Sequence, residues 1–348
     1  MSRTDAESYY AGLGDHHVQP LWRQLGTLLP REPTSAAVPH VWRYSVVREL
    51  LLRAGEIVSA EEAERRVLML MNPGLAPLAA AATNLYAGLQ LVLPGEVAPA
   101  HRHAASALRF VVEGEGAYTA VDGERTVMSI GDLVLTPSWA WHDHGNESDA
   151  PMIWLDGLDL PLINAMEANF FGGASERSQQ QTRPADSTTR LWAHSRLNPT
   201  WVSWDQPYSP LVSYPWSVTA GVLKAALEEQ TGSPYDGVRF EYVNPLTGGP
   251  VMPMLACFVQ ALAPGQGTEA HRHTSSAIYH VVSGNGRSIV DGVTIDWGPR
   301  DTFAIPGWAV HEHVNDAGDE PAILFSFSDE PVLRGLGYLR EAPAERQR

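Results

Sequence analysis

The chain has 348 residues, of which 44% are apolar, and its formal net charge is −16. This length exceeds what one hydrophobic core usually supports, so we expect two domains. The negative charge argues against binding to nucleic acid or to an anionic membrane, because both require a basic surface.

Residues 1–72 are predicted to form an N-terminal helical arm. Helical patterns extend over roughly 5–29 and 42–70, and Ser59, followed by acidic residues, is suited to cap a helix. The N-terminus has no apolar core of signal-peptide length, and no window reaches the ~18 apolar residues of a membrane span. We therefore expect a cytoplasmic protein.

Short apolar runs separated by Gly, Asp and Pro fill residues 73–170 and again 237–340. This spacing is typical of an antiparallel sandwich or barrel rather than of alternating strands and helices. Residues 171–236 combine a polar stretch with a helical pattern and are predicted to be a linker with helices. Cys257, the only cysteine, lies in an apolar run and is predicted to be buried and inert, and residues 341–348 are expected to form a mobile tail.

A repeat connects the two β-rich regions. The segments 101–116 and 271–286 are identical at 9 of 16 positions without a gap, which indicates an internal duplication. What the two copies share is expected to serve the scaffold or a metal ion. What they do not share is expected to decide the function.

Each copy begins with a His-x-His pair, and a third histidine follows it. Side chains two apart in a strand point to the same face, so each pair can address one metal ion. A single pair could be polar decoration of a strand, but two complete sets favour metal sites. Three imidazoles suit zinc, copper, iron or nickel and leave positions open for a substrate. The first set, called the first triad below, is His101, His103 and His142, and the second triad is His271, His273 and His311.

Glycines, prolines and asparagines around the triads match the two motifs of the cupin family. Many cupins add a glutamate after the His-x-His pair, but Ala107 and Ala277 stand at the corresponding positions. Three neutral ligands keep the full charge of the metal available for an anionic chelating substrate. The matching residues are Gly95, Gly131, Pro137 and Asn146 in the first half and Gly265, Pro306 and Asn315 in the second.

Longer runs resemble the gentisate 1,2-dioxygenase family, bicupin enzymes that cleave an aromatic ring. The resemblance covers nearly the whole chain and extends to salicylate 1,2-dioxygenase and 1-hydroxy-2-naphthoate dioxygenase. It implies a mainly β fold of two jelly-roll cupin barrels and a homotetramer. The runs include YAGLQLVLPGEVAPAHRH, WHDHGN and WLDGLDLPL in the first half, and PYDGVRFEYVNPLTGGPVMP, HEHVN and LFSFSD in the second.

The resemblance also implies Fe(II) on the first triad. Gentisate would then open between its carboxyl- and hydroxyl-bearing carbons to give maleylpyruvate, with O2 as the second substrate. The carboxylate and ortho-hydroxyl of the substrate would chelate the iron, and this positions both reactants on one ion. We expect chemistry in the N-terminal cupin only, because Tyr279 and His280 change the pocket around the second triad.

Arg109 is the expected carboxylate anchor. It has the same strand parity as His101 and His103 if no bulge intervenes, and Tyr279 takes its place in the second copy. A guanidinium group binds a carboxylate through two charge-assisted hydrogen bonds. The alternative is a residue in a surface salt bridge.

His144, which His313 matches in the second copy, is expected to take the hydroxyl proton or to hold an oxygen intermediate. Asp156 is its possible orienting partner. The alternatives are a scaffold histidine and a loop-capping aspartate.

Three residues on one face of a predicted strand correspond to the substrate-pocket wall of the family: Tyr86, Gly88 and Gln90. Relatives often have tryptophan at the position of Tyr86. The pattern leaves gentisate, salicylate and 1-hydroxy-2-naphthoate open as substrates, since each is an ortho-hydroxy carboxylate.

Two other classes of function stay open. A non-catalytic ligand-binding bicupin would not need intact histidine triads. A zinc or manganese isomerase of sugar phosphates would need several basic residues, whereas only Arg102 and Arg109 are expected near the first triad.

Overall fold

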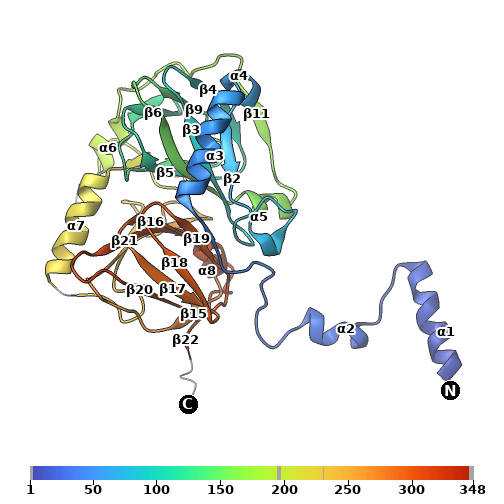
Figure 1. Cartoon of the computed structure of the whole chain (residues 1–348). Helices are drawn as coiled ribbons and strands as arrows, with labels where there is room; N and C mark the ends of the chain where they lie inside the picture. The colour runs from blue at the N-terminus through green and yellow to red at the C-terminus, as the bar shows by residue number, and fades with distance from the viewer. Residues whose placement is uncertain (1–2, 194–196, 230, 345–348) are drawn as a thin grey trace. The chain divides into compact units, whose positions relative to one another are not determined.

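The computed structural model describes residues 3–193, 197–229 and 231–344 (Figure 1). The chain divides into two compact units, Met1–Thr34 and Ser35–Arg348. The smaller unit contains α1 (Arg3–Leu13), a 3-10 turn (Gly14–His16) and α2 (Leu21–Leu28). The helix expected over 5–29 is therefore interrupted, because His17 adopts a left-handed backbone conformation and Pro20, the N-cap residue of α2, has an extended one.

In the larger unit, β1 (His40–Trp42) is followed by α3 (Tyr44–Ile57) and the short α4 (Ala60–Ala63). Ser59 caps α4 as predicted, since its Oγ accepts a hydrogen bond of 3.1 Å from the backbone N–H of Glu62. The prediction that the helix continues to residue 70 is wrong, because β2 (Arg66–Met69) forms a strand that pairs with β3 (Tyr86–Val92). Strand pairing, a tertiary contact, decides this segment over its local propensity.

Two antiparallel sheets form the first barrel. The first sheet has the order β12-β8-β5-β10-β3-β2, and the second has the order β11-β4-β9-β6-β7. Their further strands are β4 (Val97–His103), β5 (Ala107–Glu113), β6 (Ala117–Val121), β7 (Glu124–Val127), β8 (Leu133–Thr136), β9 (His142–Asn146), β10 (Met152–Leu158), β11 (Phe171–Gly173) and β12 (Ser213–Tyr214).

The second barrel repeats this arrangement with the orders β1-β19-β16-β21-β14-β13 and β18-β17-β20-β15-β22. The mainly β fold of two duplicated barrels is confirmed. Its strands are β1 (His40–Trp42), β13 (Val238–Tyr242), β14 (Ala256–Leu262), β15 (His271–His273), β16 (Ala277–Ser283), β17 (Gly286–Val290), β18 (Val293–Trp297), β19 (Thr302–Ile305), β20 (His311–Asn315), β21 (Ala322–Ser328) and β22 (Glu341–Pro343).

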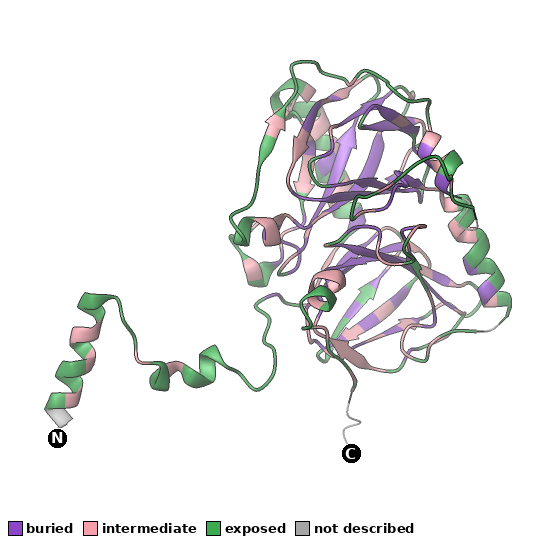
Figure 2. Cartoon of the chain, turned by 180° about the vertical axis from the view of Figure 1, so that it is seen from behind, coloured by how far each residue is buried: buried purple, intermediate pink, exposed green. Residues whose placement is uncertain are grey.

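The largest hydrophobic cluster contains residues of both barrels, and two further clusters lie mainly within one barrel each. Figure 2 shows buried residues on strands of both barrels. Phe110 of β5 stacks on Phe325 of β21 with ring centroids 4.1 Å apart. Gly157 of β10 lies so close to Phe327 that an added Cβ would come within 2.7 Å of that ring. Cys257 is fully buried in this core, as predicted.

The remaining helices lie outside the barrel sheets. Within residues 171–236 the structure shows helices together with β11 and β12. Residues 341–343 of the expected tail form β22, which pairs with β15, and residues 345–348 lie outside the described part of the chain. No helix in the described residues is long and apolar enough to cross a membrane. The helices are α5 (Leu160–Ala165), α6 (Ser187–Trp192), α7 (Trp216–Glu228), α8 (Glu330–Gly335) and the 3-10 turn Pro73–Leu75.

The division into an arm (1–72), an N-terminal barrel (73–170), a linker (171–236), a C-terminal barrel (237–340) and a tail (341–348) stays a proposal. The strands add one qualification. β1 pairs with β19 of the second barrel and β2 pairs with β3 of the first, so the arm contributes a strand to each barrel.

Candidate metal centre

The first triad is brought together by two neighbouring strands. His101 and His103 end β4, and His142 begins β9 directly opposite His101. The ligand nitrogens of the three imidazoles all lie within 4.8 Å of one another. A spacing of this size is what convergence on one ion requires.

Backbone carbonyl groups orient each imidazole of the first triad. The Nδ1 atoms lie 3.1 Å from the Pro99 carbonyl for His101, 2.7 Å from the Ala105 carbonyl for His103 and 2.9 Å from the Ala140 carbonyl for His142. A carbonyl only accepts, so each Nδ1 carries the proton and each Nε2 keeps a lone pair. The pattern is that of metal-ligating histidines.

Burial keeps these imidazoles neutral. It lowers the pKa of His101 to about 2, reinforced by the charge of Arg65, and lowers the pKa of His103 to about 4. The Nε2 atom of His142 is buried and has no hydrogen-bond partner among the described residues. A buried lone pair without a donor is costly unless an ion or ligand satisfies it, so the residues fit a metal ion.

Arg109 does not lie on the same strand as the histidines, contrary to the parity argument. β4 ends at His103, the chain turns, and β5 begins at Ala107. The Arg109 side chain still reaches the site. It is buried and donates a hydrogen bond to Thr136 Oγ1. Burial is the main cause that lowers the pKa of His142, and the charge of Arg109 lowers it further. Arg109 is therefore close to the first triad, as predicted, but it lies on β5 and not on the strand that carries His101 and His103.

Asp156 is the ionic partner of Arg109. Its Oδ1 lies 3.5 Å from Arg109 Nε and accepts a hydrogen bond of 3.1 Å from Trp154 Nε1. Burial raises the pKa of Asp156 to about 6, opposed by the charge of Arg109. Asp156 therefore fixes the guanidinium group and does not bind His144, so its predicted role as the orienting partner of His144 is wrong.

His144 is oriented by Thr119, a residue that the sequence analysis missed. His144 Nδ1 lies 3.0 Å from Thr119 Oγ1, whose hydroxyl hydrogen is directed to the sulfur of Met128 at 3.3 Å. The Nδ1–H of His144 then donates to Thr119, and Nε2 is left as an acceptor without a partner in the described residues. The rings of His144 and His142 are 5.7 Å apart between centroids.

Arg65 was also missed, because its segment was assigned to a helix. It lies between α4 and β2, and its Nη2 donates to the Pro99 carbonyl at 3.3 Å. Its Nε is buried without a hydrogen-bond partner in the described chain, and its charge acts on His101 and His103. A second guanidinium group thus lies beside the first triad.

The predicted wall residues lie on β3, beside β10. Gly88 is opposite Asp156, and Gln90 is opposite Trp154. An added Cβ at Gly88 would meet the Tyr86 hydroxyl oxygen at 2.8 Å, so glycine keeps room for this ring. Gln90 is buried, and its Nε2 has no partner among the described residues. The wall therefore offers polar groups close to the Arg109 and Asp156 pair.

The second triad has a similar arrangement on β15 and β20. His271 lies opposite His311, and the three ligand nitrogens again lie within 4.8 Å of one another. Tyr279 occupies the position of Arg109, as expected, and stacks on Phe303 with centroids 5.2 Å apart. The second site therefore has the three histidine ligands of the first site but no residue that corresponds to the Arg109 guanidinium group.

The sequence and the structure are similar to those of known cupin proteins. The family described as "Cupin domain" matches residues 88–158 and 258–328, one segment in each barrel. Gentisate 1,2 dioxygenase 1 of Aquipseudomonas alcaligenes is 43% identical over 97% of this chain and 96% of the relative. The chain belongs to the gentisate 1,2-dioxygenase family. It is a ring-cleaving dioxygenase built from two cupin domains.

Other relatives of this dioxygenase are named for different substrates. 5-Aminosalicylate 1,2-dioxygenase of Comamonas sp is 40% identical over 97% of this chain and 90% of the relative. The solved salicylate 1,2-dioxygenase of Pseudoaminobacter salicylatoxidans, in adducts with gentisate, has a TM-score of 0.93 at 36% identity and covers 99% of this chain and 96% of its own. Members of this family are thus named for different ortho-hydroxy aromatic acids.

Proposed function

We propose that this dioxygenase cleaves gentisate between its carboxyl- and hydroxyl-bearing carbons and yields maleylpyruvate, with Fe(II) held by the first triad. The observation that carries the proposal is the pair of guanidinium groups, Arg65 and Arg109, beside three metal-oriented imidazoles. A small aromatic acid that chelates the metal presents a carboxylate to these cations.

The residues around the first triad have separable roles. Bound iron would supply Lewis acidity and a common ligand for the substrate and dioxygen. Arg109, fixed by Asp156, binds the substrate carboxylate through charge-assisted hydrogen bonds, and Arg65 adds a second cation. His144 Nε2, an unprotonated acceptor, takes the proton of the ortho-hydroxyl group.

Two wall residues favour gentisate over the alternatives. Gentisate carries a second hydroxyl group, which salicylate and 1-hydroxy-2-naphthoate lack. Gln90 offers a buried amide without a partner in the described chain, and the Tyr86 hydroxyl lies over Gly88, the residue between them on the same face of β3. A polar wall accepts a hydroxyl group more readily than the second, apolar ring of the naphthoate.

The test is oxygen uptake by the iron-loaded chain with gentisate, salicylate and 1-hydroxy-2-naphthoate side by side. Gentisate is expected to give the highest kcat/KM and a product with the absorbance of a ring-opened dicarboxylate. Preference for salicylate or the naphthoate would select that alternative. Iron binding without oxygen uptake on any of the three would favour the non-catalytic ligand-binding protein.

No observation favours the sugar-phosphate isomerase. The guanidinium group of Arg102, which was counted near the first triad, lies over the rings of Trp139 and Trp141, at 4.3 and 4.7 Å from their centroids. Assembly as a homotetramer and a cytoplasmic location remain proposals. Light scattering coupled to size-exclusion chromatography tests the first.

A further inference from the structure

The loop between β8 and β9 has an unfavourable backbone conformation at one residue. Trp139 has a φ of 63°, in the left-handed region that favours glycine and in which a bulky side chain is rare. Such a conformation persists where the surrounding contacts stabilise it, and it is most frequent at functional sites. Three residues after Trp139 the chain reaches His142, the third ligand of the first triad.

Trp139 is bonded to the strand that carries the other two ligands. Its N–H donates a hydrogen bond of 2.8 Å to the carbonyl of His103, and Ser138 Oγ donates one of 2.6 Å to the carbonyl of Ala104. β9 begins at His142, so no residue of β9 lies opposite His103 in the described strand register. On this side of β4, the loop therefore takes the place of a strand partner for His103.

The ring of Trp139 is covered by a cation. The guanidinium carbon of Arg102 lies 4.3 Å from the centroid of the Trp139 ring and 4.7 Å from that of Trp141. Gly172 of β11 lies opposite Arg102, and an added Cβ there would be 3.5 Å from Arg102 Nε, so β11 packs directly over this cluster. Arg102 is the middle residue of the His-x-His pair, and its stacking therefore joins the ligand strand to the loop.

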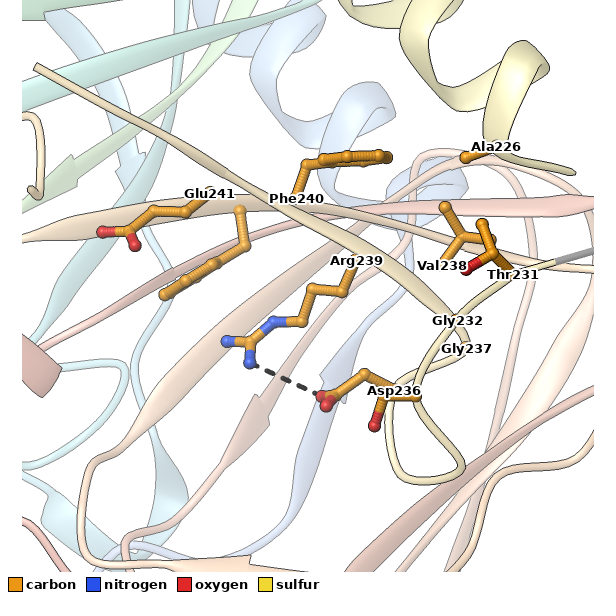
Figure 3. Close-up of a pocket in the computed structure, with 11 residues that line it drawn as sticks. Ala226, Thr231, Gly232, Asp236, Gly237, Val238, Arg239, Phe240 and Glu241 are labelled. Carbon is orange, nitrogen blue, oxygen red and sulfur yellow. Dashed lines mark ion pairs between the residues drawn. The ribbon is translucent and has the colours of Figure 1, made fainter. Parts of the chain in front are cut away.

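An arginine over an aromatic ring can also have a carboxylate partner. Arg239 lies 3.8 Å from the centroid of the Phe258 ring, beside a surface cavity of about 430 Å³, and its Nη1 is 3.5 Å from Asp236 Oδ1 (Figure 3). Arg102 differs, because its buried Nε has no hydrogen-bond partner among the described residues. The two indole rings are therefore its main favourable contacts, and a cation–π contact is strongest where the cation is desolvated.

The second copy of the repeat has part of this arrangement. Trp308 has a φ of 67°, its N–H donates a hydrogen bond of 2.6 Å to the carbonyl of His273, and the guanidinium carbon of Arg272 lies 4.4 Å from its ring centroid. At the position of Trp141, however, the second copy has Val310. One arginine on one tryptophan is thus common to both copies, whereas the second indole ring belongs to the first site alone.

We propose that Arg102, Trp139 and Trp141 form a cation–π cluster that positions the ligands of the first triad, and that this cluster sets how tightly and for how long the triad holds its metal ion. The three side chains supply no ligand nitrogen and are positioning residues. Without the cluster, the loop and the His103 end of β4 are free to separate, and the metal affinity falls because the imidazoles no longer converge. The inference rests on the proposed function only in requiring a metal ion at the first triad, and it holds for any aromatic acid.

The test measures Co(II) binding to the full chain in a His273→Ala, His311→Ala background, in which only the first triad is complete. Arg102→Met keeps an unbranched side chain but removes the cation. It is expected to weaken Co(II) binding about tenfold and to speed release of the ion to a chelator by a similar factor. Arg102→Lys keeps the charge and should lie between the two. Arg125→Met is the matched control, because Arg125 lies 3.9 Å from the centroid of the Tyr118 ring in the same barrel, and it should change Co(II) affinity little.

The tryptophan variants separate the rings from the backbone. Trp139→Gly suits the left-handed conformation, so it removes the ring without a backbone cost, and it is still expected to weaken Co(II) binding roughly tenfold. Trp141→Val, which introduces the side chain of the second copy, should weaken it less, and Trp141→Phe should weaken it least. The urea midpoint of each metal-free variant reports the effect of the substitution on the fold alone.

Equal Co(II) affinities and release rates in Arg102→Met, Trp139→Gly and the background chain would overturn the proposal. A loss in Arg102→Met that follows the urea midpoint and that Arg102→Lys does not reduce would also overturn it, because that pattern indicates packing alone. If the background chain itself binds no Co(II), the proposed function fails together with the inference. None of these measurements requires turnover, so a failure of the inference alone is distinguishable from a failure of the proposed function.

Discussion

Arg109 Nε lies 3.5 Å from Asp156 Oδ1, and both side chains are almost completely buried, with 4% and 8% exposed. The two residues face each other on adjacent antiparallel strands, β5 and β10. Asp156 beside Nε and Thr136, which accepts from Nη1, together set the direction of the guanidinium group. The ion pair with Asp156 thus holds the Arg109 guanidinium group in one orientation, in which it is suited to bind an anion.

Replacing Arg109 with Ala is expected to raise the KM for gentisate by about 100-fold, because a charge-assisted bidentate contact contributes roughly 3 kcal/mol. Iron content should stay the same, because Arg109 binds no metal. Steady-state oxygen uptake and metal analysis give the two readouts. Arg125→Ala, which breaks a surface ion pair with Glu147 in the same barrel, is the control and should change KM little. Loss of iron in Arg109→Ala would remove its assigned role.

Arg65 gives a second, independent test of the anion site. Its charge reaches the first triad from the segment between α4 and β2, while burial lowers its pKa to about 10, so it is a cation at neutral pH. Arg65→Ala is expected to raise KM about tenfold or more with little change in iron content. Arg53→Ala, an exposed change on α3, should have no effect. An unchanged KM would show that Arg109 alone binds the carboxylate.

Much of the first metal site could be predicted from the sequence, because the histidine motif occurs in both halves of the chain. The His-x-His spacing fixes two side chains on one strand face, and the second copy confirms which residues belong to the scaffold. Arg109 was selected correctly as a neighbour of the first triad, but for a wrong reason. The turn between β4 and β5 carries it onto the other sheet of the barrel, and sequence parity cannot show a change of sheet.

Arg65 and Thr119 could not have been found in the same way. Arg65 follows an acidic helical pattern, and only pairing of β2 with β3 shows that the helix ends before it. Thr119 is one polar residue in an apolar strand, and the sequence carries no signal that it lies beside His144. Both roles depend on contacts between segments that are distant along the chain.

Thr119→Val is expected to lower kcat by about 10- to 100-fold, because it removes the hydrogen bond that orients His144. The KM for gentisate and the iron content should change much less, since Thr119 contacts neither the anion site nor the metal ligands. Thr119→Ser keeps the hydroxyl group and should restore most of kcat. An equal loss in both variants would point to packing rather than to orientation.

Asp159 provides a prediction for stability as a function of pH. It is buried and accepts a hydrogen bond of 2.8 Å from Ser106 N–H, and burial raises its pKa to about 7. In the unfolded chain an aspartate titrates near its ordinary value of about 4. The folded protein therefore binds more protons than the unfolded chain between about pH 4 and 7, and this residue makes the free energy of unfolding fall as pH rises through that interval.

Asp159→Asn keeps an oxygen acceptor for Ser106 and removes the ionisation. The stability of the variant relative to wild type should therefore increase as pH is raised from 4 to 7, and then stay constant. Urea denaturation of the metal-free chain, with midpoints measured at half-unit pH intervals, gives the comparison. The exposed substitution Asp149→Asn is the control and should show no such trend. A difference that does not vary with pH would mean that Asp159 is ionised throughout and is held by Ser106 strongly enough to offset its burial.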